Sequence, residues 1–194
     1  MLHDGGVHLN IRELFEISPI ITAAKNEEGL NHAMETDSTV VFILYGTILN
    51  IQKIVDKIKD RGKLAIVHVD LIAGFSSKEV VVDFIKENTR ADGIISTKPM
   101  LVRHAIELGL VGGQRTFLID SMALDNMKKQ LESFKPDFME LMPGVMPGVL
   151  RVVRQVTDIP LVAGGLLSDK KDIMAAFDAG VDAVSTTKEE LWYV

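Results

Sequence analysis

Short, nearly continuous apolar runs alternate along the chain with segments of helical periodicity. Residues 40–44 are all apolar, whereas the apolar residues between Ile51 and Ile58 recur at the spacing of one helical face. Short continuous runs are typical of strands that are buried on both faces. Strict alternation of strand and helix predicts parallel pairing with right-handed crossovers. The pattern predicts strands over residues 19–24, 40–46, 64–70, 92–98, 115–120, 138–142, 159–165 and 181–187.

Eight strand–helix units predict a closed (β/α)8 barrel of the TIM type. The chain has 194 residues, which is at the lower limit for this fold and requires short loops throughout. The alternative is an open, doubly wound sheet, which would need fewer strands than the pattern contains. We expect a single barrel domain over residues 1–194, with residues 1–10 forming a loose end or an end added in cloning.

Several local signals predict where helices begin and end. Asn10 and Glu13 resemble a capping pair, so a short helix is expected to cover one end of the core. Ser76 and Glu79 resemble a capping box at the start of another helix. The repeated Met-Pro-Gly-Val at 142–149 is interpreted as a strand exit followed by a helix that begins at a proline. Glycines are expected to end three helices, at Gly62, Gly109 and Gly180.

The amino-acid composition excludes several kinds of functional site. The chain is 47% hydrophobic and 25% charged, which is ordinary for a globular protein. It has no cysteine, which excludes disulfides, thiol nucleophiles and thiolate metal sites. The first residues lack a continuous apolar segment and no apolar run approaches the length of a membrane span, so we expect a cytoplasmic protein without a membrane partner. The net charge of −6 gives no general electrostatic signal for nucleic acid.

A pair of strand ends near the carboxyl terminus indicates a phosphate site. One apolar run ends in Gly164 and Gly165, and glycines allow backbone N–H groups to approach an anion closely. The next run ends in Ser185, Thr186 and Thr187. Barrel enzymes build phosphate sites from the loops after strands seven and eight. Because glycine also occurs in tight turns for steric reasons alone, the second loop is what favours the functional interpretation.

Polar residues close the other apolar runs as well. In a barrel the carboxyl ends of the strands meet at one mouth, so these side chains are expected to lie together. Lys98 is a cation suited either to a phosphate or to a Schiff base with a carbonyl substrate. Asp70, Asp120 and Glu140 suit the hydroxyl groups of a small polyol or, alternatively, a divalent cation. His68, two residues before Asp70, is a candidate general base or a structural interior histidine.

Five short motifs carry a resemblance to a known family. They are His68-Val69-Asp70-Leu71-Ile72, Ile95-Ser96-Thr97-Lys98, Glu140-Leu141-Met142-Pro143-Gly144, Ala163-Gly164-Gly165-Leu166 and the segment 183–192. In this order, each at a strand end, they resemble the glycerol-3-phosphate-responsive antiterminators of bacteria over residues 15–192. The resemblance implies a phosphate-binding barrel that binds the leader mRNA of glycerol-utilisation operons when glycerol 3-phosphate is present and so prevents premature termination. The mouth residues that the resemblance transfers are Asp70, Lys98, Glu140, Gly164, Gly165, Ser185 and Thr186.

The resemblance implies a regulatory protein with glycerol 3-phosphate as its effector, with no catalytic residue, no further cofactor and no metal. The alternative is a barrel enzyme for a phosphorylated three-carbon substrate or a phosphodiester, with Glu140 or His68 as acid or base. Two basic runs bear on the RNA partner, one over Lys53, Lys57 and Arg61 and one over Arg151 and Arg154. Since acidic residues interrupt the first run, it is interpreted as a solvated helix face.

Overall fold

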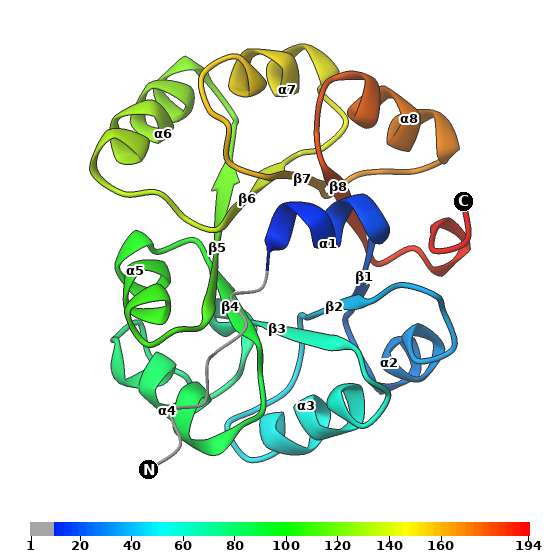
Figure 1. Cartoon of the computed structure of the whole chain (residues 1–194), viewed down its shortest axis with the longest axis vertical. Helices are drawn as coiled ribbons and strands as arrows, with labels where there is room; N and C mark the ends of the chain where they lie inside the picture. The colour runs from blue at the N-terminus through cyan, green and yellow to red at the C-terminus, as the bar shows by residue number, and fades with distance from the viewer. Residues whose placement is uncertain (1–9) are drawn as a thin grey trace.

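Eight parallel strands close into a barrel in which strands adjacent in sequence are also adjacent in space (Figure 1). A computed structural model describes residues 10–194 of the chain. The last strand pairs with the first, Ile21 opposite Ser185, and this closure rules out the open sheet. The strands are β1 (Ile20–Ala24), β2 (Val40–Ile43), β3 (Leu64–His68), β4 (Gly93–Ser96), β5 (Val111–Phe117), β6 (Phe138–Met142), β7 (Leu161–Gly164) and β8 (Ala183–Thr186).

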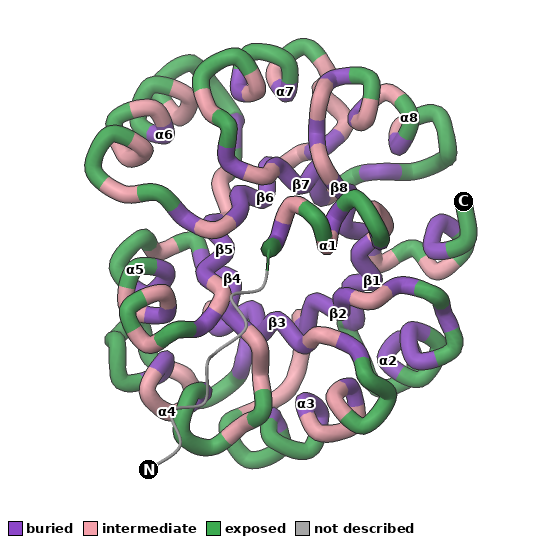
Figure 2. The backbone as a smooth tube through the Cα atoms, viewed as in Figure 1, coloured by how far each residue is buried: buried purple, intermediate pink, exposed green. Residues whose placement is uncertain are grey.

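Helices connect the strands and form an outer ring. Their inward faces and the strands are buried, while their outer faces meet solvent (Figure 2). Within residues 10–194 no helix has the length and apolarity needed to cross a bilayer. The α-helices are α1 (Ile11–Ile17), α2 (Glu27–Ala33), α3 (Ile51–Lys59), α4 (Val80–Asn88), α5 (Pro99–Glu107), α6 (Ser121–Ser133), α7 (Pro147–Arg154) and α8 (Lys170–Asp178), with short 3-10 helices η1 (Val69–Leu71) and η2 (Glu189–Leu191).

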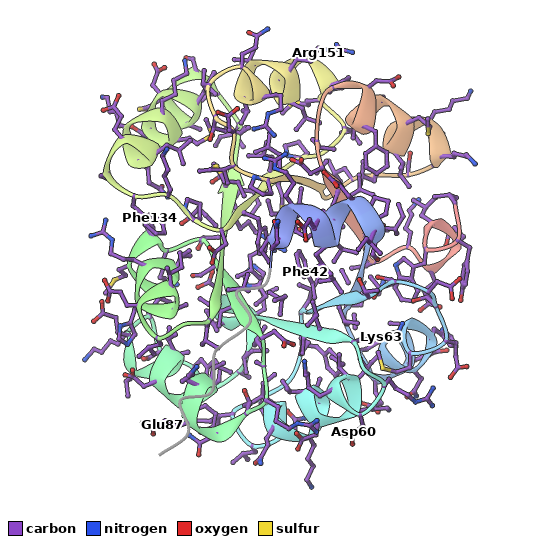
Figure 3. The ribbon with its side chains drawn as sticks, in the orientation of Figure 1. Phe42, Asp60, Lys63, Glu87, Phe134 and Arg151 are labelled. Carbon is purple, nitrogen blue, oxygen red and sulfur yellow. The ribbon has the colours of Figure 1, made fainter. Side chains whose placement is uncertain are left out.

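Aromatic rings fill the part of the barrel interior that lies towards the amino-terminal ends of the strands. Phe42 and Phe138 stack with their ring centroids 5.7 Å apart, and Phe15 of α1 meets Phe138 edge-on at the same separation. Figure 3 places Phe42 at the centre of the barrel and Arg151 on its outer circumference. As expected, α1 covers the amino-terminal end of the barrel, and Asn10 caps it by accepting a hydrogen bond from the Glu13 N–H. The loose end predicted for residues 1–10 otherwise lies outside the described residues.

Strand β5 begins earlier than the sequence pattern predicts. It spans Val111–Phe117, not 115–120, and includes Gly112 and Gly113. Both positions require glycine because neighbouring residues occupy the space that a side chain would need. A Cβ on Gly113 would lie 2.2 Å from Cζ of Phe138, so the Phe138 ring occupies the volume that a side chain at 113 would need. Arg115 is therefore near the carboxyl end of β5 and not at its beginning.

Two other local predictions need correction. Strand β3 ends at His68, and Asp70 lies in the 3-10 helix η1, so the strand geometry expected to relate these two residues does not hold. The Ser76–Glu79 capping box is also absent: α4 begins at Val80 without a side-chain cap, and the Ser76 hydroxyl accepts from the Lys78 N–H instead. The other helix-end predictions are confirmed, with Pro147 beginning α7 and positive φ angles at Gly62, Gly109 and Gly180.

Candidate functional site

Alternate residues of a strand face opposite sides of the sheet. Four polar side chains accordingly point into the upper lumen, which is the part of the barrel interior near the carboxyl ends of the strands. Ile66, Gly113, Phe138 and Ala183 face inward, and residues two positions later along a strand face the same side. The inward polar layer above the aromatic rings is accordingly His68 on β3, Arg115 on β5, Glu140 on β6 and Ser185 on β8. This layer lies towards the carboxyl ends of the strands, where barrel enzymes place their active sites.

Glu140 is the centre of one half of this layer. Its side chain is only 2% exposed and accepts hydrogen bonds from the Arg115 Nε–H and from the Ser185 hydroxyl, the latter at 2.5 Å. A buried carboxylate is tolerated only when it is paired and hydrogen-bonded, and these two donors meet that requirement. Glu140 and Ser185, both predicted site residues, are thus in direct contact, and Arg115 bonds to the other oxygen of Glu140.

Arg115 is the site residue that sequence reasoning missed. The sequence pattern predicts that the fifth strand begins at Arg115, which would place this residue far from the mouth. The observed strand begins at Val111, so Arg115 lies near the carboxyl end of the strand, at the mouth. A signal was present in the chain: Gly93, Gly112 and Gly113 lie in adjacent β4 and β5, and their Cβ positions are occupied by neighbours. Glycines in strands often mark a close approach and not a turn.

Asp70 organises the other half of the mouth. Its carboxylate accepts hydrogen bonds from the Thr97 N–H at 2.7 Å, from the hydroxyls of Ser96 and Thr97, and from the Lys98 ammonium at 2.9 Å. Burial opposes ionisation of Asp70 most strongly, but these hydrogen bonds together outweigh it and lower the pKa of Asp70. Asp70 and Lys98, predicted as neighbours at the mouth, therefore form an ion pair between η1 and the start of α5.

His68 lies between the two clusters and bonds to neither. It is 1% exposed, and neither ring nitrogen has a hydrogen-bond partner among residues 10–194. Its Nδ1 is 3.9 Å from the nearer Asp70 oxygen, beyond hydrogen-bond distance. Burial lowers the pKa of His68 to about 4; the charges of Arg115 and Lys98 act in the same direction, and the charge of Asp70 opposes them. The imidazole is neutral at physiological pH.

The turn after β7, predicted as an anion site, has an unusual backbone geometry. Gly165 and Leu166 both have positive φ, 73° and 60°, and a single residue with positive φ is already uncommon outside glycine. The Gly144 N–H fixes the turn by donating to the Gly164 carbonyl at 2.6 Å. Across residues 10–194, no acceptor bonds to the backbone N–H groups of Gly165, Leu166 or Thr187.

Thr186 forms hydrogen bonds within the loop after β8, whereas its neighbour Ser185 points into the barrel interior. Its hydroxyl accepts from the Lys188 N–H at 3.1 Å, and its carbonyl accepts from the Trp192 indole at 2.8 Å. These contacts hold the loop after β8 in shape. Because alternate residues of a strand face opposite sides, Thr186 faces away from the lumen that Ser185 enters.

The divalent-cation alternative is not supported by the placement of the acidic residues. The Asp120 carboxylate is exposed and caps α6 by accepting from the Ala123 N–H at 2.7 Å. Asp70 and Glu140 belong to separate hydrogen-bond clusters. No three histidine, aspartate or glutamate side chains within the described part of the chain are placed to share a metal ion. The alternative cation site of Asp70, Asp120 and Glu140 therefore does not assemble.

Three of the five cations in the two basic runs have acidic neighbours. Lys57 pairs with Glu27 at 2.5 Å, and Arg61 lies 3.5 Å from Glu35. Arg154 donates to Asp182 at 3.1 Å and to nearby backbone carbonyls. These contacts agree with a solvated, structural role for both runs.

Comparison with known proteins identifies the family. The family model for the glycerol-3-phosphate responsive antiterminator matches residues 20–192. A protein of Escherichia coli K12 described as uncharacterized protein YgcP is 43% identical over 179 residues, covering 92% of this chain and 94% of that protein.

Two solved structures share the fold and 30% of the aligned sequence. A glycerol uptake operon antiterminator regulatory protein from Listeria monocytogenes has a TM-score of 0.86 and 30% identity, covering 90% of this chain and 94% of that one. An antiterminator-related protein from Thermotoga maritima has a TM-score of 0.80 and 30% identity, covering 92% and 99% of the respective chains. The chain belongs to the glycerol-3-phosphate responsive antiterminator family.

Proposed function

We propose that the barrel mouth binds glycerol 3-phosphate and that the bound ligand controls binding of the protein to leader mRNA. Binding to the leader mRNA would then prevent premature termination of the transcripts of glycerol-utilisation genes. The observation that carries the proposal is the turn at Gly165 and Leu166, where unbonded backbone N–H groups accompany positive φ angles. Backbone N–H groups without an acceptor, in a turn that precedes a helix, favour an anion such as a phosphate. The Thr187 N–H in the following loop adds a donor from the neighbouring strand end.

Charged side chains across the mouth support the same ligand. Lys98 and Arg115 are cations held in place by Asp70 and Glu140, so little side-chain entropy is lost when an anion arrives. Lys98 is 37% exposed and Arg115 is 10% exposed, which makes Lys98 the cation more accessible to an entering phosphate. The carboxylates and His68 remain for the hydroxyl groups of the ligand.

Calorimetric titration with glycerol 3-phosphate tests the ligand step, with glycerol and inorganic phosphate as comparisons. We expect saturable binding of glycerol 3-phosphate and weaker binding of both fragments. Lys98→Met should weaken binding about 10-fold through loss of a charge-assisted contact. Lys57→Met removes a cation of α3 outside the mouth and should leave the affinity unchanged. Steady heat production, with or without magnesium, would instead indicate turnover and favour the enzyme alternative.

Gel-shift titration of a leader transcript tests the regulatory step. We expect the shift to appear at lower protein concentration when glycerol 3-phosphate is present, since a ligand that favours one state raises that state's apparent affinity. A transcript of scrambled sequence and equal length is the control. Ligand binding without any effect on RNA binding would retain the site and contradict the regulatory mechanism.

A further inference from the structure

His68 is the buried polar group whose hydrogen-bonding capacity is unused. Both ring nitrogens lack a partner within residues 10–194, although the side chain is almost completely buried. Buried polar atoms are normally hydrogen-bonded, and one left without a partner calls for a functional or structural reason. Since His68 faces the upper lumen, a ligand that enters the mouth is the natural partner for these two nitrogens.

We infer that the site selects phosphate esters whose other end carries hydroxyl groups, and that His68 makes this selection against carboxylates. The inference rests on the proposed function and specifies the part of the ligand that lies away from the phosphate. A neutral imidazole offers one N–H donor and one nitrogen acceptor. A hydroxyl group is both donor and acceptor and can satisfy either nitrogen, whereas a carboxylate can only accept and leaves the acceptor nitrogen unpaired.

The charged groups around His68 also disfavour a carboxylate on the ligand. The groups that face it are Asp70 on η1, Lys98 at the start of α5 and Arg115 on β5, with Glu140 on β6 paired to Arg115. Lys98 is already paired with Asp70, and Arg115 with Glu140. In the proposed site both cations also serve the phosphate, so neither is left to balance a second negative group on the ligand. A carboxylate next to His68 would approach the buried carboxylate of Glu140 and the partly buried carboxylate of Asp70, and like charges in a poorly solvated site repel strongly.

Two ligands that differ in this one group test the inference. Glycerol 3-phosphate ends in CH₂OH where glycerate 3-phosphate ends in a carboxylate. Calorimetric titration of the full chain at pH 7.5 should give at least about 10-fold tighter binding of glycerol 3-phosphate, because sites built for a hydroxyl discriminate strongly against analogues without one. Inorganic phosphate, titrated in parallel, measures the phosphate seat alone.

Substitution of His68 should reduce this preference. His68→Leu is expected to weaken glycerol 3-phosphate about 10- to 100-fold while leaving inorganic phosphate within about 2-fold of wild type. His68→Asn keeps both a donor group and an acceptor group, preserves polarity and should restore part of the preference. It also serves as the informative variant if His68→Leu fails to fold by circular dichroism. His32→Leu, on the exposed face of α2, is the matched control and should keep the wild-type preference.

The possible results separate this inference from the proposed function. Equal affinity for the two esters, or a preference for glycerate 3-phosphate, would overturn the selection while leaving the phosphate seat in place. An unchanged preference in folded His68→Leu and His68→Asn would overturn the role of His68. Failure of wild-type protein to bind any of the three probes would overturn the proposed ligand site and this inference with it.

Discussion

Gly164 lies directly against the buried carboxylate of Glu140, with no space for a side chain between them. A Cβ at position 164 would come within 2.7 Å of Glu140 Oε1 and 2.8 Å of Ser185 Oγ. Glycine is therefore required at these two consecutive positions for different reasons. Gly164 leaves room for the Glu140–Ser185 hydrogen bond inside the barrel, while Gly165, with φ of 73°, shapes the turn above it.

Gly164→Ala should lower the free energy of unfolding by about 1–3 kcal/mol, because the new methyl group displaces Glu140 or Ser185. Urea denaturation measures the change. Gly148→Ala is the control: position 148 is in α7, and its Cβ would meet nothing within 4 Å. That variant should be neutral or more stable by up to about 1 kcal/mol. Equal stability of Gly164→Ala and wild type would contradict the packing argument.

Gly113→Ala should also destabilise the barrel, by about 3 kcal/mol, because its Cβ would overlap the Phe138 ring. Phe138→Leu alone should be destabilising through loss of ring contacts. The double variant should be more stable than the sum of the two single effects predicts, since the smaller leucine makes room for the methyl group. Additive effects in a double-mutant cycle would show that the two positions do not compete for space.

Arg115→Met should lower the free energy of unfolding by about 3–5 kcal/mol, because it leaves the Glu140 charge buried without its cation. The control is Arg61→Met, which removes an exposed pair with Glu35 and should cost less than about 1 kcal/mol. Chemical denaturation of both variants gives the comparison. Similar small losses in the two variants would mean that Glu140 is stabilised without Arg115.

His68 should make stability depend on pH in the mildly acidic range. Its pKa is about 4 in the folded protein, below the ordinary value of 6.5. The unfolded chain therefore binds more protons between these values, and stability that is present above pH 6.5 decreases as the pH falls towards 4. This single group should remove about 2 kcal/mol between pH 7.5 and pH 5.

Denaturation of wild type and His68→Asn at the two pH values isolates this contribution. The variant lacks the titrating group, so its stability should fall by about 2 kcal/mol less than that of wild type over the same interval. Parallel pH dependence of the two proteins would show that His68 does not carry the effect. A steeper fall in the variant would contradict the sign of the pKa shift.

The repeating pattern of the sequence was sufficient for the architecture. Eight buried apolar runs separated by helical segments can satisfy their backbone hydrogen bonds in few ways, and the closed barrel is the way observed. The positions of Asp70 and Lys98 followed from the same reasoning, because carboxyl ends of parallel strands converge. Errors occurred where local signals had two meanings, as at Ser76, where a hydroxyl that suggests a helix cap bonds to Lys78 instead.

The sequence by itself determined the barrel, its mouth and the family, because these depend on periodicity and on short motifs within single strand ends. Only the tertiary structure decided that Arg115 pairs with Glu140, that Gly164 makes room for the Glu140–Ser185 hydrogen bond, and that His68 remains unpaired. These relationships join residues on different strands through barrel closure. Side-chain volume and burial set them, and neither quantity can be read from a linear pattern before the strands are in register.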